Sequence, residues 1–99
     1  MVQIFSNTKF ESIEYIYLTN DDSDFDFLKA KDEAKKTALT TSDFPMILSW
    51  KNSKTGESYP DYECGENKKP FWIRYAEGRG ANLVIDFNEG EYIFMILKI

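Results

Sequence analysis

The 99-residue sequence contains no histidine and a single cysteine, Cys64. Ordinary zinc and transition-metal sites use these ligands, so only a cation site made entirely of oxygen ligands is conceivable, and we expect no cofactor. Catalysis by Cys64 is also disfavoured, because a reactive thiolate needs a base or a cation, and only Lys68 and Lys69 lie nearby in the sequence. One cysteine excludes an intramolecular disulfide, which fits a cytoplasmic chain.

Long hydrophobic runs are missing as well. The longest uninterrupted apolar stretch, Tyr92 to Leu97, is far too short to span a bilayer, and the N-terminus lacks the basic-then-apolar pattern of a signal peptide. Positive charge is scarce, because 17 acidic residues against 12 basic ones give a net charge of −5. The resulting field opposes contact with phosphate backbones and anionic membranes. We therefore expect neither direct nucleic-acid binding nor membrane binding.

Apolar and aromatic residues, in contrast, are plentiful. They make up 42% and 16% of the chain, as is typical of a folded protein rather than a disordered tail. A chain of this length supports one modest core, and half of it would bury too little apolar surface to fold alone. The sequence therefore predicts a single globular domain over residues 1–99.

One helix is predicted over residues 23–38. Ser23 is the expected N-cap, with Asp26 three residues later and further acidic residues in the first turn. The Thr40–Asp43 cluster and Pro45 should end this helix. Its apolar positions recur at helical spacing, so one side should lie on a sheet. The residues of that stripe are Phe27, Ala30, Ala34 and Ala38.

Six runs of β-favouring residues predict the sheet. They cover residues 2–5, 12–18, 46–50, 71–76, 82–87 and 92–99. Residues 10–18 also fit a helical spacing, but the alternation of Ile13, Tyr15 and Tyr17 favours a strand. Short glycine-containing turns should join the last three runs as an antiparallel meander, and the apolar faces of 92–99 favour a central strand. The predicted fold class is α+β, with a mainly antiparallel sheet of about five to six strands and one principal helix packed on one face.

The acidic residues 20–33 resemble a calcium-binding EF-hand loop only in part. Carboxylates occupy the first, third, fifth and twelfth positions, but Phe27 stands where the sharp turn needs glycine. The segment also reads as a helix rather than as a loop between two helices. Helix capping explains the same acids, because they lie at the positive end of the helix dipole.

Two groups of acidic and aromatic residues are candidates for binding a partner. Residues 51–70 form a predicted irregular loop, far longer than the usual connection of about four to six residues. Tyrosines amid carboxylates offer apolar anchors together with acceptors for Lys and Arg. The alternatives are a plain hairpin tip, an unrecognised strand near Ser58–Glu63, and simple capping at the helix entrance. The candidate residues are Asp21, Asp22, Asp24 and Asp26 at the helix entrance, and Tyr59, Asp61, Tyr62, Glu63 and Glu66 in the loop.

These features predict a small acidic inhibitor, not an enzyme, that blocks a basic protein. The partner could be a nuclease toxin or another nucleic-acid-binding protein, whose cleft the carboxylates would occupy in place of phosphates. Immunity proteins, antitoxins and phage-encoded nuclease inhibitors are of this physical type. One alternative is a small enzyme or ligand-binding domain with a pocket between helix and sheet, using carboxylates and Arg74 or Arg79. Another is a structural subunit that pairs through an edge strand such as Met46 to Trp50; the oligomeric state is left open.

Overall fold

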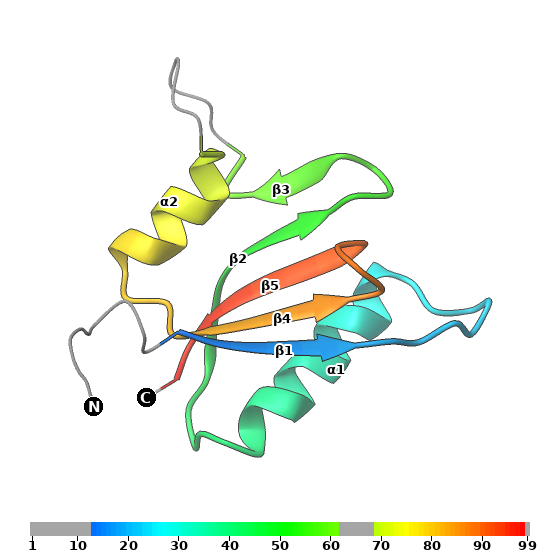
Figure 1. Cartoon of the computed structure of the whole chain (residues 1–99), viewed down its shortest axis with the longest axis horizontal. Helices are drawn as coiled ribbons and strands as arrows, with labels where there is room; N and C mark the ends of the chain where they lie inside the picture. Colours follow the sequence, from blue (N-terminus) through cyan, green and yellow to red (C-terminus); the bar gives the residue numbers. More distant parts are fainter. Residues whose placement is uncertain (1–12, 62–68, 99) are drawn as a thin grey trace, which may run out of the picture.

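The computed structural model describes residues 13–61 and 69–98. In this part of the chain five strands form one sheet in the order β1-β4-β5-β2-β3, with two helices packed against it (Figure 1). Strand β1 runs parallel to β4, and the other neighbouring strands are antiparallel. The fold is therefore α+β with a mixed, mostly antiparallel sheet. The elements are β1 (Glu14–Leu18), α1 (Phe27–Leu39), β2 (Met46–Asn52), β3 (Glu57–Tyr59), α2 (Phe71–Gly78), β4 (Leu83–Phe87) and β5 (Tyr92–Leu97).

Strand β5 lies in the middle of the sheet and is covered on both faces, as its sequence predicts. Tyr92, Phe94 and Ile96 face α1 and join one buried cluster. Met95 and Ile93 face the other way, in the cluster around α2. Alternation in a strand places successive side chains on opposite faces, so two apolar faces require two covering layers. The predicted central strand is confirmed.

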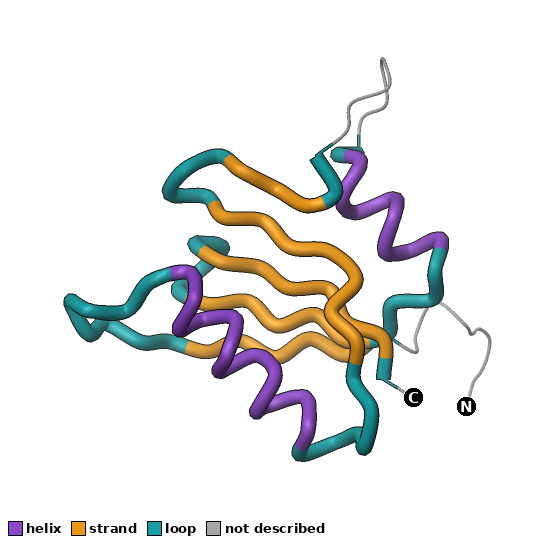
Figure 2. The backbone as a smooth tube through the Cα atoms, turned by 180° about the vertical axis from the view of Figure 1, so that it is seen from behind, coloured by secondary structure: helices purple, strands orange, loops and turns teal. Residues whose placement is uncertain are grey.

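Helix α1 crosses one face of the sheet (Figure 2), and its buried positions are Ala30, Ala34 and Ala38. Phe27 is partly buried against the same cluster. The helix begins later than predicted, because Asp26 and not Ser23 is the N-cap: its carboxylate accepts a hydrogen bond from the Lys29 amide. The helix starts immediately after Phe25, whose ring is buried in the core.

The prediction of a strand at residues 71–76 is wrong, because this segment is helix α2. Its buried residues, Trp72 and Ala76, are four positions apart and so lie on one side of a helix. The "EGRGA" segment therefore ends a helix instead of turning a hairpin. Gly80 has φ +88°, and the Ala81 amide donates to the carbonyl of Ala76. Only β4 and β5 remain of the predicted meander.

The predicted irregular loop at 51–70 is shorter than expected. Its first residues extend β2, and Glu57–Tyr59 form β3, which pairs antiparallel with β2. In the strand order β2 therefore has a neighbour on each side, and β1 and β3 are the outermost strands; β3 pairs with β2 at Trp50–Asn52. Residues 12–18 do form a strand, at Glu14–Leu18, whereas the predicted strand at 2–5 lies outside the described residues. Neither described helix has the length and apolar character to cross a membrane.

Candidate protein-binding surface

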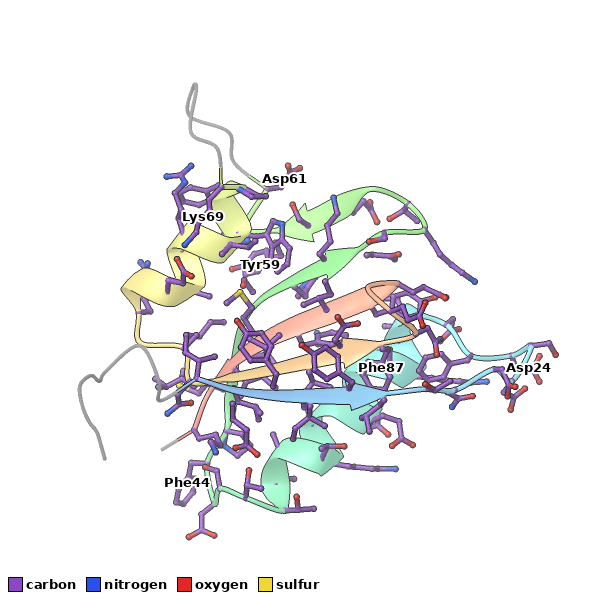
Figure 3. The ribbon with its side chains drawn as sticks, viewed as in Figure 1. Asp24, Phe44, Tyr59, Asp61, Lys69 and Phe87 are labelled. Carbon is purple, nitrogen blue, oxygen red and sulfur yellow. The ribbon has the colours of Figure 1, made fainter. Side chains whose placement is uncertain are left out.

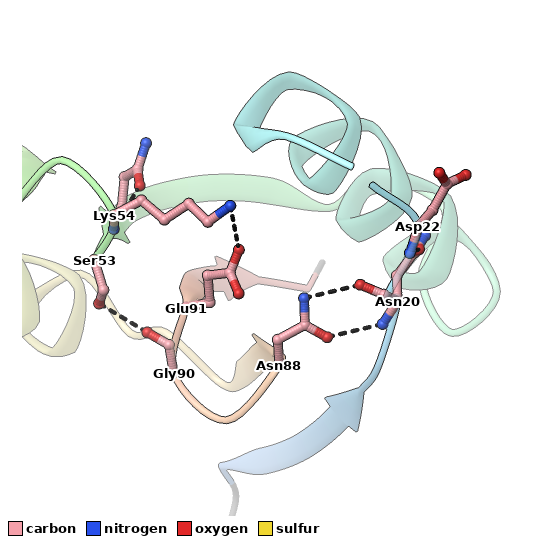
Figure 4. A network of polar contacts seen from close by, with 8 residues as sticks. Asn20, Asp22, Ser53, Lys54, Asn88, Gly90 and Glu91 are labelled. Carbon is pink, nitrogen blue, oxygen red and sulfur yellow. Dashed lines mark hydrogen bonds and ion pairs between the residues drawn. The ribbon is translucent and has the colours of Figure 1, made fainter. Parts of the chain in front are cut away.

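The segment between β1 and α1, residues 20–26, is called the acidic loop here, and its first residue is held to the sheet by a pair of asparagines (Figure 4). The Asn20 amide donates to Oδ1 of Asn88 at 2.8 Å, and Nδ2 of Asn88 donates to the Asn20 carbonyl at 3.0 Å. Asn88 sits in the β4–β5 turn with φ +54°, a conformation that asparagine tolerates better than most residues. This reciprocal pair fixes where the loop leaves β1.

Side chains inside the acidic loop then hold its backbone. Oδ1 of Asn20 accepts from the Asp22 amide, and Oδ1 of Asp22 accepts from the Asp24 amide, each at 3.0 Å. Lys29 donates from Nζ to the Asp24 carbonyl at 2.9 Å. Bonds of this kind let Asn and Asp replace the regular backbone pairing that a loop lacks. The loop is therefore braced locally even though most of it is exposed.

Phe25 anchors the acidic loop to the core. Its side chain is only 7% exposed. The ring centroid lies 5.5 Å from that of Phe87 and 5.8 Å from that of Tyr92. Such tilted and edge-on pairs are the geometry that aromatic rings favour. With Phe25 turned inward, the neighbouring carboxylates of Asp24 and Asp26 are left at the surface.

Next to the acidic loop, the first turns of α1 present an exposed leucine among carboxylates. Leu28 is 71% exposed. It lines an open hollow of about 280 Å³ together with Asp22, Asp32 and Glu33. The carboxylate of Asp32 also lies 3.2 Å from Nζ of Lys36. An apolar side chain surrounded by charge is the arrangement that protein interfaces commonly use, with an anchor at the centre and a charged rim.

A second hollow joins the acidic loop to the β2–β3 and β4–β5 turns. Nζ of Lys54 lies 3.3 Å from Oε2 of Glu91 on its wall, and the hydrogen bond and charge of that carboxylate raise the pKa of Lys54. Ser53 donates to the Gly90 carbonyl at 2.8 Å, which ties the two turns together. Burial raises the pKa of Tyr92, the first residue of β5, which lies directly after the β4–β5 turn. The positive charge on the wall of this hollow, that of Lys54, is therefore already paired with a carboxylate.

The second predicted cluster lies elsewhere. Asp24 lies at the right-hand tip of the molecule in Figure 3 and Asp61 near its top, beside the start of α2, so the structure does not bring the two groups together. Tyr59 is stacked on Trp50, with ring centroids 6.3 Å apart, and Asp61 is exposed. Tyr62, Glu63 and Glu66 lie outside the described residues. Each cluster must therefore be judged as a separate surface.

The alternative prediction was a pocket between helix and sheet that would use Arg74 or Arg79, and the structure places these residues elsewhere. Large side chains such as Phe94 and Phe87 fill the interface between α1 and the sheet. Arg74 lies on α2 and Arg79 is its C-cap residue, and their guanidinium groups lie over the rings of Phe71 and Tyr75 at 5.2 and 3.8 Å. These arginines are arranged for cation–π contact on a helix surface. Neither faces the buried space between α1 and the sheet.

The acids of residues 20–33 do not gather as a cation site. No group of three or more potential metal-ligating side chains occurs within residues 13–61 and 69–98. Asp22 and Asp26 use their carboxylates to accept backbone amides, and Glu33 lies on α1. Helix capping explains Asp26, as the sequence-based interpretation has it, whereas Asp22 braces the loop, and the predicted acidic residues in the first turn of the helix are not there.

Three contributors to this surface were not identified from the sequence: Leu28, Asp32 and Asn88. Leu28 follows the buried Phe27 in the helix but falls outside the stripe of buried alanines, and that offset is a signal of exposure. Asn88 follows β4 in a turn, where asparagine has many roles. Its bond to Asn20, 68 residues away, leaves no trace in the sequence.

Comparison with known proteins places the chain in a family. A family model described as "Domain of unknown function (DUF5619)" matches residues 13–96. The chain belongs to this family. The match begins just before β1 and ends within β5, so it takes in the whole described sheet, both helices and the acidic loop.

Two matches, one by sequence and one by structure, come from Archaeoglobus fulgidus. An uncharacterized protein is 50% identical over 52 residues, which are 52% of this chain and 54% of the relative, so the chain spans about half of that relative's length. A crystal structure of the novel protein AF1514 matches with a TM-score of 0.74 and 29% identity, over 88% of this chain and 95% of that chain. The likeness to AF1514 supports the α+β fold, and neither description names an activity or a partner.

Proposed function

We propose that the protein is a small binding domain that neutralises a basic protein, and that the acidic loop with the start of α1 is its contact surface. The observation that carries the proposal is the exposed Leu28 beside carboxylates whose loop is braced and anchored from within. A surface ordered before binding loses less conformational entropy on association. Its negative charge would steer a basic partner toward it and pair with Lys and Arg at the rim.

The partner class follows from the sign of the charge. Proteins that handle nucleic acids carry Lys and Arg where they contact phosphates, and carboxylates can occupy the same positions. We therefore propose a nuclease or another nucleic-acid-binding protein as the partner, in the manner of immunity proteins and antitoxins. We also propose a cytoplasmic location, because a chain with only Cys64 has no internal disulfide of the kind that small secreted domains use.

The described surface supports binding more than catalysis. The hollows beside the acidic loop are open to solvent, and both are lined by charged groups that are largely paired with the protein's own atoms. A catalytic pocket would instead be expected to enclose its substrate and to hold groups with perturbed pKa values. Exposed apolar side chains such as Leu28 fit contact with another protein.

The test is an affinity pull-down from native lysate at low and moderate salt, using the wild-type protein and two charge-reversed variants. Asp21→Lys/Asp24→Lys reverses two exposed carboxylates that hold no bond among the described residues, so the bracing of the loop stays intact. Asp43→Lys/Asp61→Lys makes the same charge change away from the acidic loop, at exposed carboxylates that follow the C-terminal end of α1 and strand β3. We expect a basic protein to be retained by the wild type and by the second variant, and lost by the first.

A second measurement tests neutralisation itself. If the captured protein is a nuclease, its cleavage of nucleic acid should fall on addition of the wild type and stay high with Asp21→Lys/Asp24→Lys. Recovery of the wild type alone at both salt concentrations would contradict the proposal. Retention of the same partner by all three proteins would show that the contact lies outside the acidic loop.

A further inference from the structure

Strand β1 is an edge strand whose outer backbone groups have no partner among the described residues. In a parallel pair, alternate residues point their N–H and C=O groups toward the neighbouring strand. The Glu14 amide donates to the Asn82 carbonyl and the Leu18 carbonyl accepts from the Asn88 amide, so this set faces β4. The backbone groups of Tyr15 and Tyr17 consequently point to the free edge.

The side chains at this edge are also apolar and exposed. Tyr15 is 57% exposed and Tyr17 70%. Their rings stack on each other on the face opposite α1, with centroids 6.3 Å apart and planes at 12°. Glu14 is the charged residue of the strand, and its Oε1 forms an ion pair with Nζ of Lys98 at 2.8 Å. A protein of net charge −5 thus presents an uncharged, aromatic strip at one place.

The opposite edge of the sheet, β3, is protected against pairing with a strand of another chain, whereas the β1 edge is not. Strand β3 has only three residues and is followed by Pro60, both of which discourage pairing with another chain. Strand β1 has five residues, and it lacks a proline, a lysine and a bulge. Edge strands with these properties are templates for strand addition.

We propose that two copies of this chain pair antiparallel through β1, with Ile16 opposite Ile16 of the second copy. This register sets Tyr15 opposite Tyr17 of the second copy, and both residues have outward backbone groups, so they exchange N–H···O=C bonds as an antiparallel pair requires. The two stacked tyrosines of each copy then meet the other two across the junction. The strand is self-complementary in this register, which a two-fold symmetric dimer demands.

Charge favours the antiparallel over the parallel arrangement. The acidic loop follows directly from the end of β1 (Figure 1). Parallel pairing would place two acidic loops side by side, whereas antiparallel pairing sends them to opposite ends of the dimer. Like charges in contact are destabilising, so the antiparallel form is preferred. Such a dimer would carry two separate partner-binding surfaces.

The expected dimer is weak. A tyrosine side chain buries roughly 150–250 Å² when it is covered, so the exposed parts of the four rings contribute on the order of 500 Å². Specific interfaces bury about 1,000 Å² or more in total, and the strand backbones and Ile16 must supply the remainder. The dissociation constant should therefore fall in the micromolar range, with a clear dependence on concentration.

Sedimentation velocity over a wide concentration range tests the pairing. The wild type should shift from monomer to dimer, and Tyr15→Lys/Tyr17→Lys should weaken dimerisation by at least roughly tenfold, because introduced lysines then face each other across the junction. Tyr59→Lys, a matched change on the other edge strand, should leave the dimer unchanged. A wild type that sediments as a monomer throughout the range would overturn the proposal.

A mixing experiment tests the register and separates loss of pairing from misfolding. Tyr15→Lys mixed with Tyr17→Glu should form a heterodimer more stable than either homodimer, because the two altered positions face each other. Tyr15→Lys mixed with Tyr15→Glu should gain nothing, since position 15 does not face itself. The reverse pattern would show parallel pairing and overturn the assigned register.

Hydrogen exchange distinguishes a second copy from coverage by the same chain. The amides of Tyr15 and Tyr17 should exchange rapidly in dilute protein and slowly at concentrations where the dimer forms. Protection that does not change with concentration would mean that the edge is covered within one copy, and the proposal would be wrong.

Discussion

Truncation of Phe25 to alanine should destabilise the whole domain, because this ring joins the acidic loop to the core. The side chain is 7% exposed and contacts Phe87 and Tyr92. A buried phenylalanine removes roughly 150–200 Å² from water, which at about 25 cal/mol per Å² corresponds to about 4 kcal/mol. Phe→Ala substitutions in cores cost about 3–5 kcal/mol, and a site at the margin of the core relaxes more easily, so we expect about 3 kcal/mol.

The assay is urea and thermal unfolding of the wild type and Phe25→Ala, followed by tyrosine and tryptophan fluorescence and by circular dichroism. A loss of about 3 kcal/mol should lower the thermal midpoint by roughly 12–24 °C in a domain of this size. The matched control is Leu28→Ala, three residues along the chain, which removes an exposed side chain and should change stability by less than about 0.5 kcal/mol.

The two variants should also differ in the acidic loop itself. Loss of the Phe25 anchor should speed the exchange of loop amides, including those of Asp22 and Asp24, whereas Leu28→Ala should leave them as they are. If Phe25→Ala cost less than about 1 kcal/mol, the ring would not be the anchor that its burial indicates. The argument that the loop is held in place before binding would then fail.

Three further outcomes follow from particular contacts. Asp26→Ala removes the N-cap bond to the Lys29 amide and should cost about 1 kcal/mol in urea unfolding, whereas Asp26→Asn, which keeps an acceptor, should cost less. Ser49 is buried with a hydroxyl that has no partner among the described residues, so Ser49→Ala should raise the unfolding free energy by about 1 kcal/mol; a loss of stability would show that the hydroxyl is satisfied. Burial raises the pKa of Tyr92, so the neutral phenol stabilises the fold fully below the ordinary tyrosine pKa of about 10, and this stability is lost as the pH rises above that value. Above pH 10 the urea midpoint should therefore fall less steeply with pH in Tyr92→Phe than in the wild type. An equal fall in the two proteins would contradict this.

Periodicity in the sequence was enough to predict α1 and β5. The alanines of α1 recur every four residues, and helix geometry places them on one side whatever the rest of the chain does. Two apolar faces in β5 imply two covering layers, which the structure shows. The start of α1 was predicted too early, because Ser23 and Asp26 are both good N-caps. Burial of Phe25 against Phe87 and Tyr92 selects Asp26 as the N-cap. Phe87 and Tyr92 come from the far end of the chain, so local sequence does not show this contact.

Helix α2 and strand β3 could not be predicted from local preferences. The run from Phe71 to Ala76 is rich in residues that favour strands, but packing of Trp72 and Ala76 against the sheet selects a helix. Strand β3 has three residues, too few to show a period, and exists through its pairing with β2. Both depend on tertiary contacts that propensity does not include.

The candidate surface was predicted only in part. Exposed acids at the helix entrance were identified from composition and capping, and the structure places Asp21, Asp22, Asp24 and Asp26 there together. That Asp61 lies far from the acidic loop depends on the order of strands in the sheet. The exposure of Leu28 was missed although it falls outside the stripe of buried alanines, because an apolar residue in an amphipathic helix is usually assigned to the core.

The most direct test of the central claim is the affinity of the captured partner for the two charge-reversed variants at low salt. We expect Asp21→Lys/Asp24→Lys to bind at least roughly tenfold more weakly than the wild type, with slower association, and Asp43→Lys/Asp61→Lys to bind as the wild type does. Equal weakening by both variants would show only a general effect of net charge. Weakening by the second variant alone would move the contact away from the acidic loop and contradict the account.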